Sequence, residues 1–225
     1  YTPVSRLPEG ANSFTAQATD SFGHVSNSVN AAFTIDTFPP LITLTTTPPA
    51  LTNQPLQTLI GTLSEPATLL LNGLWVDIGA APEYRFSYPL TLTEGANTLA
   101  LTATDRAANR GYLTLGITLD TIAPTAPNAS LIQAAIPANG QTTVTATAGA
   151  VEAASVVKIT NLTTNLTVTV TATADGAFSA QIGAASKDEL TIAATDQAGN
   201  QSATTKITVP GSGGGGDGAI PPDPA

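Results

Sequence analysis

The sequence LTATDRAANR at residues 101–110 recurs twice in this 225-residue chain, as AQATDSFGHV at 16–25 and as IAATDQAGNQ at 192–201. The shared aspartates, Asp20, Asp105 and Asp196, lie 85 and 91 residues apart. A catalytic motif is needed once in each catalytic unit, whereas a structural corner is needed once in each module. The recurrence therefore indicates a tandem array of small modules.

Apolar and polar residues alternate on both sides of this corner. Leu99, Leu101 and Ala103 take every second position before Asp105, and the alternation resumes after the turn, at Leu113 and Leu115. Phe14 and Leu190 are the equivalents of Leu99 in the other copies. A period of two predicts strands with one face on a core, so each module is expected to end in a β-hairpin.

Turn signals divide the chain into parts. PEGANSF at 8–14 and TEGANTL at 93–99 predict a tight turn before the strand, because Gly10 and Gly95 accept a positive φ and Asn12 and Asn97 bond the local backbone. Proline cannot donate to a sheet, so DTFPP at 36–40 and DTIAP at 120–124 mark module boundaries. We predict an incomplete module at 1–38, complete modules at 39–121 and 122–210, and a Gly/Pro-rich linker or tail at 211–225.

The two complete modules are predicted to be all-β sandwiches of about seven short strands each. Asn72-Gly73 is a predicted hairpin turn, and Asp175-Gly176 is a further turn signal. The strands of the first are expected near 41–46, 57–63, 67–71, 74–78, 85–91, 97–104 and 111–119. Those of the second are expected near 129–134, 141–148, 155–160, 165–172, 177–182, 189–195 and 202–209.

Composition excludes several classes of protein. The net charge is −9 and the basic residues are scattered, which argues against a nucleic-acid partner. Cysteine is absent, so there are no disulfides, thiolate metal sites or cysteine nucleophiles. We expect no membrane span, because no run of about 18 apolar residues occurs. The sequence does not begin with Met and shows no signal peptide, so we interpret it as a mature piece or a fragment.

The acidic residues are the candidate metal ligands. Asp20, Asp36, Asp105, Asp120 and Asp196 are possible calcium ligands, since hard cations take oxygen ligands. For Asp20, Asp105 and Asp196 we favour a scaffolding role, in which each aspartate accepts backbone N–H bonds and shapes a turn, because every copy of the corner offers one carboxylate. Asp36 and Asp120, at the module boundaries, are predicted to end a strand and orient the linker that follows. GGGGDG at 213–218 is similarly read as a linker, and the chain is predicted to need no cofactor.

Aromatic residues are the candidate sugar-binding groups. Trp75, Tyr84 and Phe86 would stack on sugar rings if they lay exposed in a row, but a single Trp in a sandwich is more often part of the core. His24, the only histidine, is interpreted as a surface residue, and no catalytic residues are predicted.

The EGAN, ATDxAxN and DTxxP motifs together resemble the bacterial Ig-like repeat domains found in tandem on large surface proteins and adhesins. The middle module is also similar to Ig-like modules attached to extracellular polysaccharide-degrading enzymes. The resemblance covers residues 8 to about 210. It implies a secreted or cell-surface protein whose modules act mostly as spacers.

Two functions are therefore carried forward. The first is a non-enzymatic structural or adhesive array, and the second is a carbohydrate-binding or spacer module accessory to an enzyme. Residues 1–38 match only the last third of a module, and their hairpin cannot bury its apolar face alone. Either the array continues beyond this sequence, or strands of a neighbouring copy complete the module and join chains into a fibre.

Overall fold

The computed structural model describes residues 6–211, which form an all-β fold with a single 3-10 turn. The predicted fold class is confirmed. The predicted tail, apart from Gly211, lies outside the described residues. The chain divides into two compact units, one formed by residues up to Ala50 with Pro55–Thr118, and one by Leu51–Gln54 with residues from Leu119 onward. The predicted module boundaries stay predictions.

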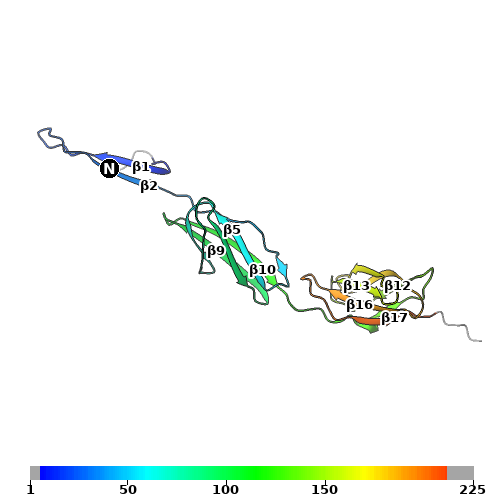
Figure 1. The fold of residues 1–225 in the computed structure, drawn as a ribbon. Helices are drawn as coiled ribbons and strands as arrows, with labels where there is room; N and C mark the ends of the chain where they lie inside the picture. Colours follow the sequence, from blue (N-terminus) through cyan, green and yellow to red (C-terminus); the bar gives the residue numbers. More distant parts are fainter. Residues whose placement is uncertain (1–5, 212–225) are drawn as a thin grey trace, which may run out of the picture. The chain divides into compact units, whose positions relative to one another are not determined.

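The first unit begins with a two-stranded hairpin, drawn in blue in Figure 1. Strands β1 (Gly10–Ala16) and β2 (Val29–Ile35) pair antiparallel, with Phe14 opposite Ala31. The ring centroids of Phe14 and Phe33 lie 6.2 Å apart, so the two rings share one face. This is the face that the alternating pattern predicts.

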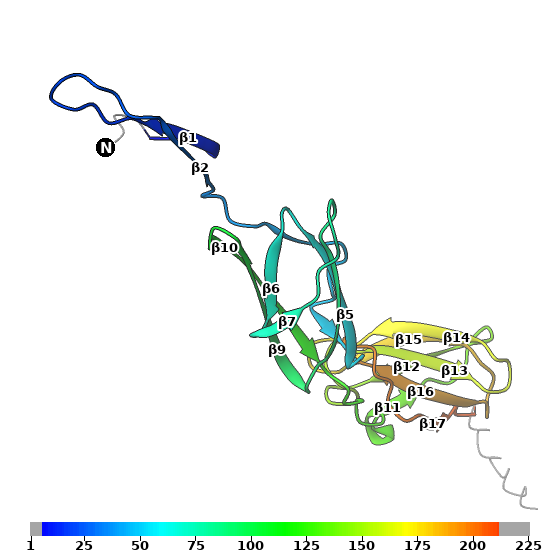
Figure 2. The same ribbon diagram turned by 60° about the vertical axis from the view of Figure 1, so that its left-hand side comes forward.

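A sandwich of two sheets, formed by strands between residues 42 and 119, follows the hairpin in the chain (Figure 2). One sheet has the order β3 (Ile42–Leu44), β5 (Leu56–Leu63) and β8 (Arg85–Thr91). The other has the order β4 (Leu51–Thr52), β10 (Arg110–Leu119), β9 (Gly95–Asp105), β6 (Ala67–Leu71) and β7 (Leu74–Val76). Both sheets contribute buried side chains, among them Leu59, Phe86, Leu69, Leu101 and Ile117.

The second unit contains the other sandwich. One sheet has the order β11 (Ile132–Ala134), β12 (Gln141–Ala146) and β15 (Phe178–Gly183). The other has the order β14 (Thr167–Thr171), β13 (Val156–Asn161), β16 (Glu189–Thr195) and β17 (Thr205–Thr208). Val144, Ile159, Leu190 and Ile192 are fully buried in its core. This sandwich has the predicted seven strands, and the first has eight.

The predicted strands at 67–71, 85–91 and 189–195 match the structure at both ends. The prediction of strand at 129–131 is wrong, because these residues form a 3-10 helix whose first turn is capped by the Asn128 side chain. β4 is the additional strand. Its two residues are too few to show a period, and Pro49 and Pro55 flank them.

The turn predictions are confirmed. Asn72 and Gly73 have φ of 48° and 83°, which is the two-residue turn that joins β6 to β7. Gly10 and Gly95 have φ of 91° and 88°. Asn12 and Asn97 donate side-chain hydrogen bonds to the carbonyls of Gly10 and Gly95.

Candidate functional site

The aspartate of each corner organises the turn that follows it. In the first sandwich, Asp105 Oδ1 accepts the Asn109 backbone N–H at 2.9 Å, and Oδ2 accepts Asn109 Nδ2 at 2.8 Å. In the second sandwich, Asp196 Oδ1 accepts the N–H groups of Gly199 and Asn200, and Oδ2 accepts Asn200 Nδ2. These contacts are those expected of a scaffolding aspartate.

The asparagine of the corner also bonds the segment by which the chain enters the sandwich. Asn109 Nδ2 donates to the backbone carbonyl of Asp36 at 3.0 Å, and Asn200 Nδ2 donates to that of Asp120 at 2.8 Å. We call residues 36–40 and 120–124 the incoming segments. Each asparagine therefore uses one amide group for two purposes, since it closes its own corner and fixes the incoming segment.

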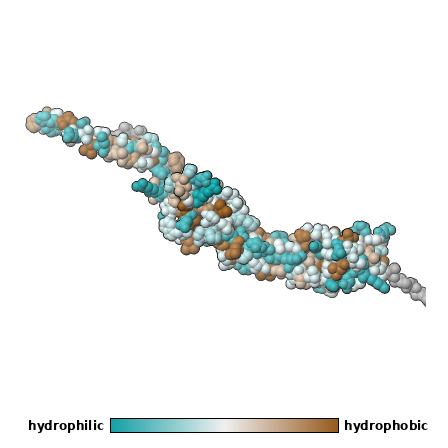
Figure 3. Space-filling model, in the orientation of Figure 1, coloured by the Kyte–Doolittle hydropathy of each residue, from teal (hydrophilic) through white to brown (hydrophobic). Residues whose placement is uncertain are grey.

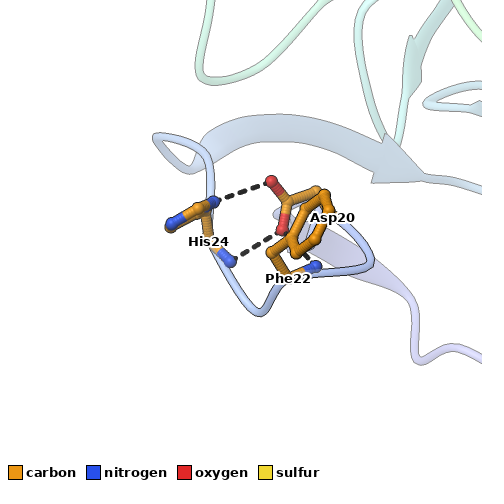
Figure 4. Close-up of polar contacts among 3 residues, drawn as sticks. All are labelled: Asp20, Phe22 and His24. Atoms are coloured by element: carbon orange, nitrogen blue, oxygen red, sulfur yellow. Dashed lines mark hydrogen bonds and ion pairs between the residues drawn. The ribbon is translucent and has the colours of Figure 1, made fainter.

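The hairpin carries a third version of the corner, shown in Figure 4. Asp20 Oδ1 accepts the N–H groups of Phe22 and His24, both at 2.9 Å, and His24 Nδ1 lies 2.8 Å from Asp20 Oδ2. The imidazole of His24 thus takes the place of the asparagine amide. The side chains of His24 and Asp20 are 82% and 48% exposed.

Hydrogen bonding shifts the pKa of two of these aspartates. The His24 side chain, followed by the His24 backbone N–H, lowers the pKa of Asp20. For Asp196, burial raises the pKa, but hydrogen bonds from the side chain and backbone of Asn200 and from Gly199 outweigh it, and the net shift is downward. In both corners the ionised carboxylate is the form that the turn stabilises.

The residue six positions after each aspartate differs between the copies. Gly111 takes this place in the first sandwich, where an added Cβ would lie 1.8 Å from the carbonyl oxygen of Pro40. Ser202 takes it in the second, and its Oγ accepts the Ala194 N–H and donates to the Ala203 carbonyl. Ser26 of the hairpin makes the same pair of bonds, from Ala18 and to Asn27.

The structure brings three carboxylates together near one corner. Ligand oxygens of Asp36, Glu65 and Asp105 all lie within 4.8 Å of one another. Burial, followed by the charges of Asp36 and Asp105, raises the pKa of Glu65. Asp36 and Asp105 are predicted calcium candidates, whereas Glu65 was not predicted. No second group of three potential ligands lies this close among residues 6–211, so Asp20, Asp120 and Asp196 are not part of such a group.

Asp36 and Asp120, which lie in the incoming segments, also have local roles. Asp36 Oδ1 accepts the Phe38 N–H, and Asp120 Oδ1 accepts the Ile122 N–H. These bonds support the predicted role of both residues in ending a strand and orienting the segment that follows.

The three aromatic candidates do not form a row. Trp75 lies on the edge strand β7 and is 74% exposed, so the expectation that it belongs to the core is wrong. Phe86 is 2% exposed and packs in the core, which removes it from any sugar-binding surface. Tyr84 is half-buried, with φ of 41°, just before β8.

The apolar face of the hairpin lies open. Phe14 is 54% exposed and Phe33 38% exposed, and Val29 beside them is also exposed. Figure 3 shows apolar side chains at the surface of this part of the chain. Among residues 6–211, β1 and β2 pair with no strand other than each other. No helix in this same stretch is long and apolar enough to cross a membrane.

Comparison with known proteins supports the Ig-like assignment. Residues 123–211 match the family model of the bacterial Ig domain, which confirms the predicted resemblance for that part of the chain. No curated protein sequence matches the chain.

Similar solved structures share little sequence with the chain. The FN1-FN3 domains of chicken CNTN1 are 12% identical, with 91% of this chain and 77% of that one covered and a TM-score of 0.43. A tetra-tandem repeat in the extending region of a large adhesion protein is 19% identical, with coverages of 90% and 57% and a TM-score of 0.34. The BSP domain of a biofilm associated protein is 15% identical, with coverages of 92% and 43% and a TM-score of 0.29. Scores this low support no functional argument.

Proposed function

We propose that the chain is a non-enzymatic, extracellular structural array of Ig-like modules that belongs to a surface or adhesive protein. The observation that carries this proposal is the repeated bond from the corner asparagine to the incoming segment, at Asn109 and again at Asn200. A bond of this kind adds to the strand ladders in resisting extension of the chain. The bacterial Ig domain match at residues 123–211 supports the same proposal.

Stretching single molecules of the full chain tests the proposal. We expect two separate unfolding events, one for each sandwich, with each residue released adding about 3.6 Å of contour length. The double variant Asn109→Ala with Asn200→Ala should unfold at lower force. Extension without discrete events would exclude a load-bearing role, and hydrolase activity of the purified chain would contradict a non-enzymatic one.

We further propose that the open face of the hairpin receives a sheet of the β3-β5-β8 type, from another Ig-like module or from a neighbouring copy. Leu99 and Leu190, the equivalents of Phe14, are 5% and 0% exposed because such a sheet covers them. Two hairpins placed face to face would cover the apolar side chains less well. Seven-residue strands give a face of about 240 Å², and two such faces remain far below the roughly 1,200 Å² of a stable interface.

Carbohydrate binding is the second candidate, and the exposure of Trp75 favours it. Trp75 is the only tryptophan, so its fluorescence reports on this surface alone. If sugar stacks on the ring, soluble polysaccharide should quench or shift the emission, and Trp75→Ala should abolish retention in affinity electrophoresis. Leu74→Ala is the matched control, since Leu74 is the exposed neighbour on the same strand. Unchanged emission with every polysaccharide tried would exclude this function.

A further inference from the structure

The side chain that closes the corner is used differently in the hairpin and in the two sandwiches. Asn109 and Asn200 each donate to an aspartate carboxylate of the corner and to a backbone carbonyl of the incoming segment. His24 stands at the same position and faces Asp20 through Nδ1. Its ring is otherwise open to solvent, at 82% exposure.

We propose that the Asp20–His24 corner binds the main-chain carbonyl of an extended Asp-Thr-Xaa-Xaa-Pro segment, and that it does so only when His24 carries both ring protons. The proposal rests on the proposed function, because that function assigns the hairpin to an Ig-like module entered by such a segment. The partner is defined by its chemistry, which is that of residues 36–40 and 120–124.

The proton requirement follows from the number of donors. An asparagine amide has two hydrogens, so Asn109 and Asn200 serve the carboxylate and the carbonyl at any pH. A neutral imidazole has one N–H, and opposite the Asp20 carboxylate that proton is on Nδ1. Nε2 is then an acceptor and repels a carbonyl. Protonation adds the second N–H on Nε2, so only the imidazolium offers as many donors as the asparagine amide.

Few charges surround this group within the hairpin, but the bound segment and the covering sheet would bring the equivalents of Asp36 and Glu65, which lie close to Asp105 in the first sandwich. These carboxylates would favour the protonated ring. Asp20 and His24 are the only titratable side chains between residues 17 and 28, the loop that joins β1 to β2. Asp20 stays in place whatever the state of His24, because the backbone N–H groups of Phe22 and His24 also bond its Oδ1. The change on titration is therefore confined to the outward ring nitrogen.

The neighbouring serine selects between the two kinds of incoming segment. Ser26 makes the bonds that Ser202 makes, whereas Gly111 leaves room for the Pro40 carbonyl, which a Cβ would meet at 1.8 Å. The hairpin corner should accordingly take a segment like Asp120–Pro124, which is bonded by Asn200 of the corner that contains Ser202, and should exclude one like residues 36–40.

Two chimeras of the full chain test the proposal. In both, a copy of residues 41–92 is placed directly before Pro8, so that β3–β8 can cover the hairpin. In one of them, a copy of Asp120–Pro124 precedes residue 41, and the other lacks it. The ring of His24, the only histidine in either chimera, is followed by NMR at about pH 5 and about pH 8. Hydrogen exchange of residues 10–16 and 29–35 reports whether the hairpin is covered.

We expect amide protection of the hairpin in both chimeras. The Nε2–H proton of His24 should be protected from solvent exchange only in the chimera with the added segment, and only at the lower pH. His24→Asn should remove the pH dependence, and the segment should then raise the melting temperature of the composite module by about 4–8 °C at both pH values.

Three results would overturn the inference. If both chimeras protect the hairpin but His24 behaves alike in them, the proposed function survives and the corner does not bind the segment. If the segment binds equally at both pH values, the proton requirement is wrong. If neither chimera protects the hairpin, the proposed covering sheet fails, and the inference fails with it.

Discussion

The hairpin β1–β2 and the strand pair β16–β17 have the same sequence pattern and the same corner, yet they differ in what lies over them. Leu190 of β16 is fully buried, whereas its equivalent Phe14 is 54% exposed. In both corners Oδ1 of the aspartate accepts the backbone N–H of the residue four positions later, at 2.9 Å for Asp20 and 2.8 Å for Asp196. The corner therefore forms from local contacts, while burial of the strand face depends on a second sheet.

The largest loss of stability should come from truncating the buried Leu190, whereas truncating the exposed Phe14 should have little effect. Leu190→Ala removes buried methyl groups and leaves a cavity, so we expect the free energy of unfolding to fall by about 3 kcal/mol in urea titrations. Phe14→Ala should change it by less than about 0.5 kcal/mol, because the ring already contacts water. Equal losses at both positions would show that the face of the hairpin is covered in solution.

The close approach of Pro40 to the first corner gives the second test. Gly111→Ala places a Cβ 1.8 Å from the Pro40 carbonyl oxygen, so we expect a loss of about 2–3 kcal/mol as the incoming segment is displaced. Gly116→Ala, on the same strand with open space around it, should be neutral. Thermal unfolding of both variants checks this, and a harmless Gly111→Ala would mean that the segment is not fixed there.

Removing the side chain that closes a corner should have a larger effect where that side chain also bonds an incoming segment. Asn200→Ala loses the bonds to Asp196 and to the Asp120 carbonyl and should cost about 2 kcal/mol. His24→Ala loses one exposed contact and should cost about 0.5 kcal/mol or less. Hydrogen exchange near residues 120–124 should rise only in Asn200→Ala, and a rise in neither variant would contradict the assigned role.

Backbone strain separates the copies by a smaller amount. The residue three positions after the corner aspartate has a positive φ in all three copies. It is Gly23 at 87°, Gly199 at 96° and Ala108 at 72°. Since a Cβ is disfavoured in this region, Ala108→Gly should stabilise the first sandwich by about 1 kcal/mol, and Gly199→Ala should destabilise the second by a similar amount. Calorimetry checks both signs, and a loss of stability in Ala108→Gly would refute the assignment of strain.

The smallest effect concerns the acidic group near the first corner. Because folding raises the pKa of Glu65 above 4.5, the unfolded chain releases this proton first as the pH rises. Glu65 therefore lowers stability increasingly as the pH climbs from 4.5 through its raised value. Glu65→Gln should match the parent at pH 4 and exceed it at pH 7, whereas the exposed Glu152→Gln should not. Stabilisation of the parent by added calcium, lost in Glu65→Gln, would instead indicate a bound cation.

Much of the fold could be predicted because many strands place apolar residues at every second position. The runs at 67–71 and 189–195 have apolar residues on one face and turn residues at their ends, so their limits are visible in the sequence. The segment 129–131 has no such pattern, and the Asn128 cap decided its conformation. Trp75 is exposed because β7 is an edge strand, a property of the sheet order that no local window contains.

The corner itself could be predicted, but its partner could not. The Asp-x-x-x-Asn and Asp-Thr-x-x-Pro motifs are both visible in the sequence, and each occurs twice. The contact between them joins residues 73 and 80 positions apart, which spacing alone does not predict. Their fixed alternation along the chain was the available signal. No such signal pointed to Glu65 as part of the acidic group, since it lies outside both motifs.

The difference between Gly111 and Ser202 limits how such genes can recombine. A crossover that joins the sequence encoding residues 36–40 to the body of the second sandwich would bring a Pro40-like carbonyl against the serine Cβ. Exchange of whole units, each with its own incoming segment and corner, avoids this overlap. Selection should therefore favour breakpoints on the N-terminal side of the Asp-Thr-x-x-Pro motif, so that linker and corner are inherited together.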